Sequence, residues 1–593
     1  MDNNNGKNGS IHRLAGELRT LAKRSPRELA ERVAELSIRE QAELALRLPP
    51  HERLELLLHA PKPLRLVRAL PDADLYMTVR EVGPTEAMPV LALASVSQLL
   101  HLIDLESWRG DRFDPDRAGA WIAVFLEAGE PALRRFIRNA DEELLALLFR
   151  TWINVEQIEY EDSADQHGHG QTDAGTEQGA MTPDGYHRFT PSIPEHMAAV
   201  RQLLQVFYLD QPDRYQRTMW ASMWELPSDL EERALQWRQS RLQEHGFPDW
   251  DEALSVYAPP EGVTAHPRPP TPTDPDGLEA SRTFLVALPP DSLMLPSLDY
   301  LTGERRERVL FEFLSVANRI MVADGTDTGD PRSHRAAVRK AAGFVEIALG
   351  ARGAVRFETA AELLGEVPTI ELFREGFAGA VELQQRALQL KSEGWASGHT
   401  RALELLDHPI RGQVEGLLER RPLFFDHSDL ESPVLREFRS VSELEQTRVA
   451  VEMAEALGRL LIEQMGLELE RVLAGTAPAA EAHRFSTLLT TLLAWHATRG
   501  EVRGDPLPAD VVADFLRTVA SRRTATPEAP QRALESLLSD LRTTYGVSPR
   551  ESSVIEGYGR YCLERLSEEC GGLDPGVPVD RRVVGCLLVA EGD

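Results

Sequence analysis

The stretch Leu48-Pro-Pro-His-Glu-Arg-Leu-Glu-Leu-Leu-Leu58 decides how this chain is expected to fold. Its prolines mark a helix start, because proline is tolerated in the first helical turn, and Leu54, Leu57 and Leu58 then lie on one helix face. Pro61 ends the helix after about ten residues. Because a helix this short cannot bury its apolar face alone, the stretch predicts short helices that stack on one another.

Similar start signals recur on both sides of this stretch. Ser25-Pro-Arg-Glu28 combines an N-cap serine, a proline at the first helical position and a capping-box glutamate, and Ser37-Ile-Arg-Glu40 repeats the box. Further starts are indicated by Pro71, Pro84 and Ser95-Val-Ser-Gln98. Residues 11–160 are therefore predicted to form a solenoid-like, superhelical domain of short helices.

The rest of the chain is divided by two stretches without helical periodicity. Residues 161–194, which include His167 and His169, read as a disordered insertion, and residues 259–277 read as a proline-rich linker. Between them, residues 195–258 are helical and aromatic-rich. Residues 278–593 are predicted to form a C-terminal domain of long helices.

The long helices of this C-terminal domain are expected at 302–322, 332–349, 370–391 and 441–465. Two short apolar runs, 284–288 and 583–590, are candidate strands, although their length does not separate a strand from a buried helix piece. The predicted fold class is mainly α, with one small two-stranded sheet as an open addition.

Aromatic residues gather in the helical segment 195–258. Trp220 and Trp224 lie four apart on one helix face, and we interpret the cluster as packing core, with a ring-lined groove as the alternative. The cluster consists of Phe207, Tyr208, Tyr215, Trp220, Trp224, Trp237, Phe247 and Trp250.

Charge and cysteine content limit the function classes. Sixty-five Lys and Arg residues against 94 Asp and Glu residues leave a formal charge of -29, which repels a phosphate backbone, so no nucleic-acid partner is expected. Three late cysteines without CxxC spacing fit a reducing cytoplasm. No apolar run is long enough to span a membrane, and no signal peptide is evident.

Common catalytic motifs are missing from the sequence. It contains no GxxxxGK[ST], no HExxH, no GxSxG and no paired CxxC, which removes the sequence support for the usual nucleotide, zinc-protease and hydrolase interpretations. The remaining candidates rest on residue type and spacing.

Three aspartates form the first candidate site. Asp324, Asp327 and Asp330 stand at intervals of three between two predicted helices, and oxygen-rich loops of this kind hold magnesium or calcium (Mg or Ca). The stretch lacks the EF-hand spacing, so a glycine turn with capping aspartates is the alternative.

Two Asp-His pairs form the second candidate. Asp407 with His408 and Asp426 with His427 supply carboxylate and imidazole groups for a metal site or an acid-base pair, if folding brings them together. The alternative is structural: Asp407 at a helix start and Asp426 in a turn.

Four polar residues that flank apolar strings form a third candidate. Asn318, Asp324, Arg421 and Arg439 would need partners if they were buried, which predicts a buried polar network or a pocket.

Two resemblances to known families add to this. Leu48 to Leu58, followed by Leu70-Pro-Asp-Ala-Asp-Leu75, resembles the helical N-terminal domain of MgtE-type magnesium transporters, which implies a superhelical shape and not transport. Most of the chain resembles an uncharacterised bacterial family known only as a domain of unknown function. The second resemblance is carried by Asp104-Leu-Glu-Ser-Trp108, Glu231-Glu-Arg233, Arg238-Gln-Ser-Arg-Leu242, Gly246-Phe247, residues 318–325 and Arg421-Pro-Leu-Phe-Phe425.

Two hypotheses for function follow. Stacked short helices without catalytic motifs favour a cytoplasmic protein-interaction or regulatory module whose concave N-terminal face meets a protein partner. The alternative is a metal-dependent enzyme with its site in the C-terminal helical domain.

Overall fold

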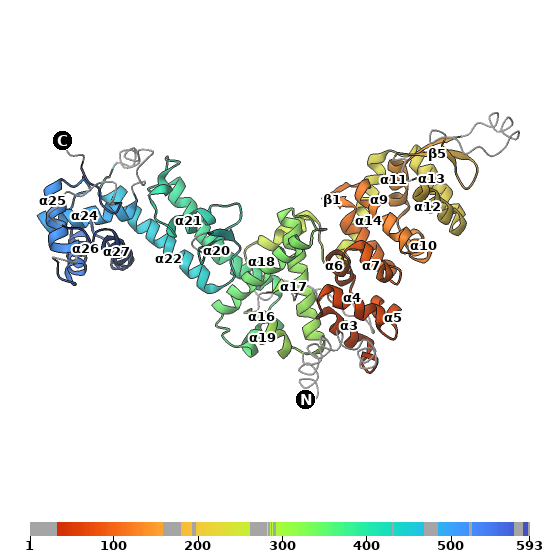
Figure 1. Ribbon diagram of the computed structural model, residues 1–593, viewed down its shortest axis with the longest axis horizontal. Helices are drawn as coiled ribbons and strands as arrows, with labels where there is room; N and C mark the ends of the chain where they lie inside the picture. Colours follow the sequence, from red (N-terminus) through yellow and green to blue (C-terminus); the bar gives the residue numbers. More distant parts are fainter. Residues whose placement is uncertain are drawn as a thin grey trace. The chain divides into compact units, whose positions relative to one another are not determined.

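A computed structural model describes residues 33–157, 179–192, 197–260, 282, 285, 287–288, 292–429, 432–467, 484–520, 525–574 and 585–590. As predicted, the fold is mainly α. The chain divides into an N-terminal unit, Met1–Glu375, and a C-terminal unit, Gly376–Asp593. Figure 1 traces both units along the sequence.

The N-terminal unit begins with a stack of short helices. The capping boxes predicted at Ser37 and Ser95 are both confirmed, while Ser25-Pro-Arg-Glu28 lies outside the described residues. Successive helices pack on their neighbours, as their length requires. They are α3 (Ile38–Leu46), α4 (Pro50–His59), α5 (Pro63–Arg68), α6 (Asp72–Val82), α7 (Pro84–Leu91) and α8 (Val96–Glu106).

Further helices and two small sheets follow in the same unit. The antiparallel pair β1 (Trp108–Arg109) and β2 (Arg112–Phe113) comes first, and the second sheet has the order β3-β5-β4. Its strands are β3 (Ile153–Gln157), β4 (Ala180–Met181) and β5 (His187–Pro191). The helices are α9 (Pro115–Glu127), α10 (Glu130–Asn139), α11 (Glu142–Trp152), α12 (Met197–Asp210), α13 (Pro212–Trp224), α14 (Pro227–Glu244) and α15 (Trp250–Leu254).

Two predicted segments fall partly outside the described residues. Within residues 161–194, the described part, 179–192, contains β4 and β5, and the remainder lies outside. Residues 261–277 of the predicted linker also lie outside.

Longer helices complete the N-terminal unit. Helix α17 packs along α18 and against α15, and α18 also contacts α6 of the short-helix stack. The helices are α16 (Met294–Ser297), α17 (Gly303–Asp324), α18 (Pro331–Ala351), α19 (Phe357–Glu366) and α20 (Thr369–Ser392), the last of which continues into the C-terminal unit. The four long helices predicted from the sequence correspond to α17, α18, α20 and α22.

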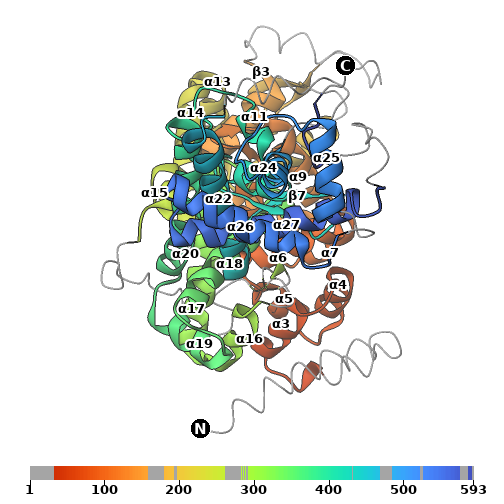
Figure 2. The ribbon, with the colours of Figure 1, turned by 90° about the vertical axis from the view of Figure 1, so that its left-hand side faces the viewer.

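The C-terminal unit is built from helices and one hairpin. Helix α22 contacts α21 and α27, and α24 contacts α26 and α27 (Figures 1 and 2). The hairpin pairs β6 (Phe424–Asp426) with β7 (Val434–Arg436). The helices are α21 (Ile410–Leu417), α22 (Val441–Gly458), α24 (Phe485–Arg499), α25 (Ala509–Phe515), α26 (Ala529–Tyr545) and α27 (Pro549–Glu569).

The candidate strand at 583–590 contributes one bridge. Val589 pairs in parallel with Leu507, and residues 283, 284 and 286 of the other candidate lie outside the described residues.

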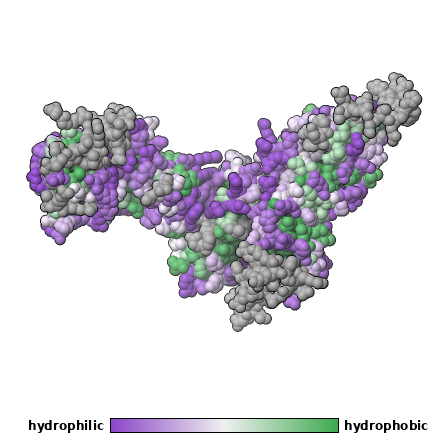
Figure 3. Space-filling model, in the orientation of Figure 1, coloured by the Kyte–Doolittle hydropathy of each residue, from purple (hydrophilic) through white to green (hydrophobic). Residues whose placement is uncertain are grey.

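On the face drawn in Figure 3 hydrophilic side chains predominate, in keeping with the acidic composition. Among the described helices, none combines the length and the apolar composition needed to cross a bilayer.

Candidate functional site

Four tryptophans expected in the core lie on the surface of the N-terminal unit. Trp220, Trp224, Trp237 and Trp250 are 58%, 65%, 53% and 55% exposed, whereas Phe207, Tyr215 and Phe247 are buried. The interpretation of the whole cluster as packing core was therefore wrong for its tryptophans. Monomeric proteins seldom leave several large aromatic side chains this open without a function.

Helix geometry explains the difference. The buried residues of α13 are Tyr215, Thr218, Met219 and Ser222, which turn toward α11 and the rest of the unit. Trp220 and Trp224 lie on the opposite side of the same helix, together with the exposed Leu226 that follows it. We call Trp220, Trp224 and Leu226 the tryptophan surface. Their spacing of four residues predicted a shared face but not which face was buried.

The backbone beneath this surface is fixed by one arginine. Nη1 of Arg150, on α11, donates to the carbonyl oxygens of Ser222, Met223 and Glu225 at 3.0, 3.3 and 2.9 Å. These carbonyls lie at the end of α13, where helical partners are missing. Arg150 therefore holds the α13–α14 connection, and with it Trp224 and Leu226, in one conformation.

Two grooves border the tryptophan surface. One, of about 530 Å³, is lined by Trp224, Leu226, Gln236 and charged residues of α14, and we call it the acidic groove. The other, of about 490 Å³, is lined by Trp220 and by further residues of α11, α13 and α14. Glu225 and Arg233 line both grooves and form an ion pair.

The charges of the two grooves differ. In the second groove Arg217 pairs with Glu142 at 2.6 Å, and this contact lowers the pKa of Glu142. In the acidic groove Glu225 is paired with Arg233, but within the described residues Asp229 and Glu232 form no ion pair. The acidic groove therefore presents two carboxylates beside the ring of Trp224.

The three predicted aspartates have partners within the N-terminal unit. Asp324 accepts a hydrogen bond from the hydroxyl of Tyr257 at 2.9 Å and pairs with Lys340 at 2.9 Å. Asp327 accepts from the backbone N–H of Gly329 at 2.8 Å, and Asp330 is the N-cap of α18. Each carboxylate thus contacts other groups of the chain.

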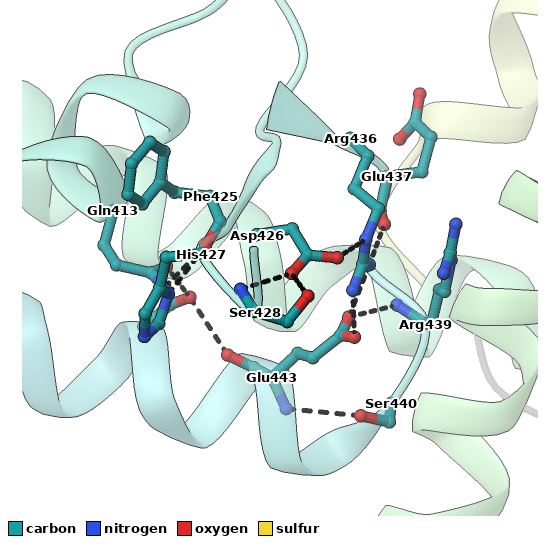
Figure 4. Close-up of polar contacts among 11 residues, drawn as sticks. Gln413, Phe425, Asp426, His427, Ser428, Arg436, Glu437, Arg439, Ser440 and Glu443 are labelled. Atoms are coloured by element: carbon teal, nitrogen blue, oxygen red, sulfur yellow. Dashed lines mark hydrogen bonds and ion pairs between the residues drawn. The ribbon is translucent and has the colours of Figure 1, made fainter. Parts of the chain in front are cut away.

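The four residues predicted as a network belong to two different units. In the N-terminal unit, Asn318 is buried and donates to the carbonyl of His245 at 3.0 Å, while Asp324 is half-buried. In the C-terminal unit, Arg421 is half-buried and Arg439 is exposed, and the backbone N–H of Arg439 donates to Glu443 at 2.7 Å (Figure 4).

The predicted histidines His408 and His427 come together in the C-terminal unit. Both rings pack against Phe425, with centroids 5.9 and 6.1 Å away, and both line a cleft of about 500 Å³. We call it the α22–α27 cleft, because most of its walls come from these helices. Its lining residues are His408, Pro409, Ile410, Gln413, His427, Ser442, Glu445, Gln446, Val449, Ala450, Met453, Gly557, Tyr558 and Tyr561.

The hairpin beside this cleft is held by Arg436. Its guanidinium contacts Asp426 at 2.6 Å and Glu443 at 2.7 Å, and Ser428 also donates to Asp426 (Figure 4). These hydrogen bonds hold the pKa of Asp426 far below its usual range. Asp426 is therefore a structural anion of the hairpin, and His427 next to it is positioned toward the cleft.

Asp407, the carboxylate of the first Asp-His pair, lies in a different environment from Asp426. Asp407 is buried and accepts hydrogen bonds from the backbone N–H of Ser486 at 3.1 Å, from its hydroxyl at 2.6 Å and from the hydroxyl of Tyr558, while Arg565 lies 3.3 Å away. These partners are far away in sequence, so no local signal could have identified them.

Three comparisons with known proteins give one family match. A family model described as "Family of unknown function (DUF6178)" matches residues 30–590. Comparison with curated proteins and with solved structures gives no match.

Within the described residues no group of three or more His, Cys, Asp or Glu side chains is arranged to hold a metal ion.

Proposed function

We propose that this chain, which belongs to the family of unknown function DUF6178, is a cytoplasmic protein-interaction module that binds a protein partner through its tryptophan surface. The observation that carries the proposal is the exposure of Trp220, Trp224 and Leu226, which are 58%, 65% and 63% exposed. Tryptophan is the residue type most enriched among interface hot spots, where a few side chains supply most of the binding energy.

The acidic groove indicates the chemistry of the partner. A lysine or arginine side chain placed there would meet the carboxylates of Asp229 and Glu232 and the face of Trp224 together. The net charge of -29 would also attract a basic segment over a longer range. We therefore propose a partner segment that carries basic residues next to apolar ones.

The test compares two surface variants of the full chain. Trp220→Ser with Trp224→Ser removes both rings of the tryptophan surface, and Trp250→Ser removes an equally exposed tryptophan on α15 as the matched control. Proteins captured from native lysate are quantified by mass spectrometry, and a basic partner is then titrated as purified protein. We expect roughly 30-fold weaker binding for the double variant, as for the loss of a hot spot.

The control makes the outcome decisive. A partner held equally by wild type, the double variant and Trp250→Ser would overturn the proposal. Lost binding in a variant whose circular dichroism spectrum is altered would indicate misfolding, so only variants with the wild-type spectrum are compared. A second double variant, Asp229→Asn with Glu232→Gln, tests the acidic groove separately from the tryptophan surface. It should weaken the binding of a basic partner and leave the binding of an uncharged partner unchanged.

Point variants are preferable to deletion of residues 1–160. That deletion would also remove α11, on which α13 and α14 pack, and with it Arg150. Lost binding would then reflect an unfolded surface.

The metal-dependent enzyme stays the alternative hypothesis. It rests on Asp324, Asp327, Asp330, His408 and His427 as residue types, and elemental analysis of the purified chain tests it.

A further inference from the structure

The α22–α27 cleft has the size and composition of a small-molecule site, independent of the tryptophan surface. Its volume of about 500 Å³ falls in the range of roughly 300–1,000 Å³ that is typical of ligand pockets. Ile410, Val449, Ala450 and Met453 make its walls mostly apolar. Such a concave apolar surface gains free energy when a ligand displaces water from it.

Aromatic and sulfur groups indicate the shape of the ligand. The ring centroids of Tyr558 and Tyr561 lie 5.8 Å apart, and both rings line the cleft together with Met453. Tyrosine rings and a thioether both form favourable contacts with the edge or face of an aromatic ring. A flat aromatic ligand therefore fits these walls better than a branched one.

Polar groups at the cleft indicate what the ligand carries. His427 Nδ1 lies 3.3 Å from the carbonyl of Phe425, to which it can donate, which leaves Nε2 as an acceptor. Within the described residues the ring of His408 and the hydroxyl of Tyr561 make no hydrogen bond, although both groups line the cleft. A ligand hydroxyl can donate to an imidazole nitrogen and accept from the tyrosine hydroxyl.

The charges at the cleft favour an uncharged ligand. No Lys or Arg side chain is among the lining residues of the cleft. Glu445 is the one carboxylate among the lining residues; its side chain is exposed and pairs with Arg448 at 3.2 Å. The interior therefore offers no unpaired charge to a ligand ion, whose desolvation would be unfavourable.

Gly557 gives an independent observation. It lies within α27, where glycine is less favourable than alanine, and a Cβ at this position would meet only Met453 Cε, at 3.8 Å. Gly559 in the same helix differs, because a Cβ there would lie 2.7 Å from Leu534. Packing thus explains Gly559, whereas at Gly557 the missing side chain leaves space in the cleft.

From these observations we propose that the α22–α27 cleft binds an uncharged aromatic molecule that carries a hydroxyl group, with the ring between Met453 and the two tyrosines and the hydroxyl toward His408 and His427.

The test uses three matched probes on the full chain. 1-Naphthol is uncharged at neutral pH, whereas naphthalene-1-carboxylate is an anion and 1-naphthylmethylammonium is a cation. Binding is measured by isothermal titration and by ligand-observed NMR. We expect 1-naphthol to bind at least tenfold more tightly than either ion.

Three variants locate the bound probe. Gly557→Leu fills the cleft from α27 and Val449→Trp fills it from α22, so both should abolish 1-naphthol binding. Gly557→Ala adds a single methyl group and should retain it.

Two results would overturn the proposal. Unchanged 1-naphthol binding in both filling variants would place the probe elsewhere, and equal binding of the three probes would reject the uncharged class. Because two walls are filled separately, a folding defect in one variant still leaves the other to decide.

Discussion

At the scale of single residues, the surroundings of His101 in the N-terminal unit support a prediction. It is buried, both of its ring nitrogens lack a hydrogen-bond partner among the described residues, and its ring lies 4.4 Å from that of His245. Burial, and then the neighbouring His245 and His334, holds the pKa of His101 well below its usual value. The ring centroid of Tyr76 lies 6.2 Å from that of His101.

We predict that this histidine makes the N-terminal unit less stable in acid. Below the unfolded-state pKa of about 6.5 the unfolded chain binds a proton that the folded chain does not, so the free energy of unfolding falls with pH by up to about 1.4 kcal/mol per unit. His101→Leu should remove about 2 kcal/mol of this loss between about pH 6.5 and about pH 5. Urea unfolding at both pH values measures it.

His51, whose side chain is 70% exposed beside Glu86, is the matched control for replacing a histidine with leucine. If wild type and His101→Leu lose the same stability in acid, His101 is not the group that titrates.

Asp407 supports a second residue-scale prediction, in the C-terminal unit. Asp407→Asn replaces a buried carboxylate that accepts from Ser486 and Tyr558 and faces Arg565, so the guanidinium keeps only Glu569 as a counter-ion. Removing one partner of a buried ion pair is expected to cost about 3 kcal/mol of unfolding free energy. Asp510→Asn is the matched control, since Asp510 pairs with Arg499 on the surface and should cost less than about 1 kcal/mol. Equal losses in urea unfolding would contradict the buried role.

At the scale of elements, two helix glycines should respond to alanine with opposite signs. In α21, a Cβ on Gly412 would lie 2.6 Å from the ring of Phe425, so Gly412→Ala must displace β6 and should destabilise the chain by about 1–3 kcal/mol. In α27, Gly557→Ala meets no such contact and should stabilise by about 0.5–1 kcal/mol. Thermal unfolding of both variants decides the point, and two shifts of the same sign would refute it.

The elements also show what the sequence could predict. The capping boxes at Ser37 and Ser95 were predictable because all of their atoms lie within four residues. The exposure of Trp224 was not, since helical periodicity defines two faces and only the packing of α13 on α11 selects the buried one.

Sites assembled from distant elements were predictable only in part. His408 and His427 were selected by residue type, yet their shared cleft depends on the β6–β7 hairpin that turns the chain back. Asp407 reaches Ser486 and Tyr558 across 79 and 151 residues, a pairing that no local pattern encodes. The cleft walls from α27 were missed, although Gly557 inside a helical stretch was a usable signal.

At the scale of the whole molecule, the boundary between the two units follows tertiary packing and not the proline-rich or polar stretches of the sequence. Proline-rich and polar stretches in the sequence suggested boundaries at 161–194 and 259–277. The contact-based division falls after Glu375, inside the continuous helix α20. A helix interior carries no linker composition, so this division depends on tertiary contacts that the sequence does not display.

The net charge supports the last prediction. A formal charge of -29 means that folding brings like charges together, and salt screens this repulsion over a Debye length of about 8 Å at physiological ionic strength. The midpoint of thermal unfolding should therefore rise between about 20 and about 500 mM NaCl.

If the Asp324, Asp327 and Asp330 loop also binds magnesium or calcium, about 5 mM of either ion should raise the midpoint of thermal unfolding more than NaCl of equal ionic strength does, because a ligand that binds only the folded state stabilises it. Asp327→Asn keeps an acceptor for the N–H of Gly329 and removes one negative ligand, so it should reduce the divalent effect and leave the NaCl effect intact. Equal shifts of the midpoint at matched ionic strength would show that charge screening alone explains the response. A divalent effect that is unchanged in Asp327→Asn would show that this loop does not bind the ion.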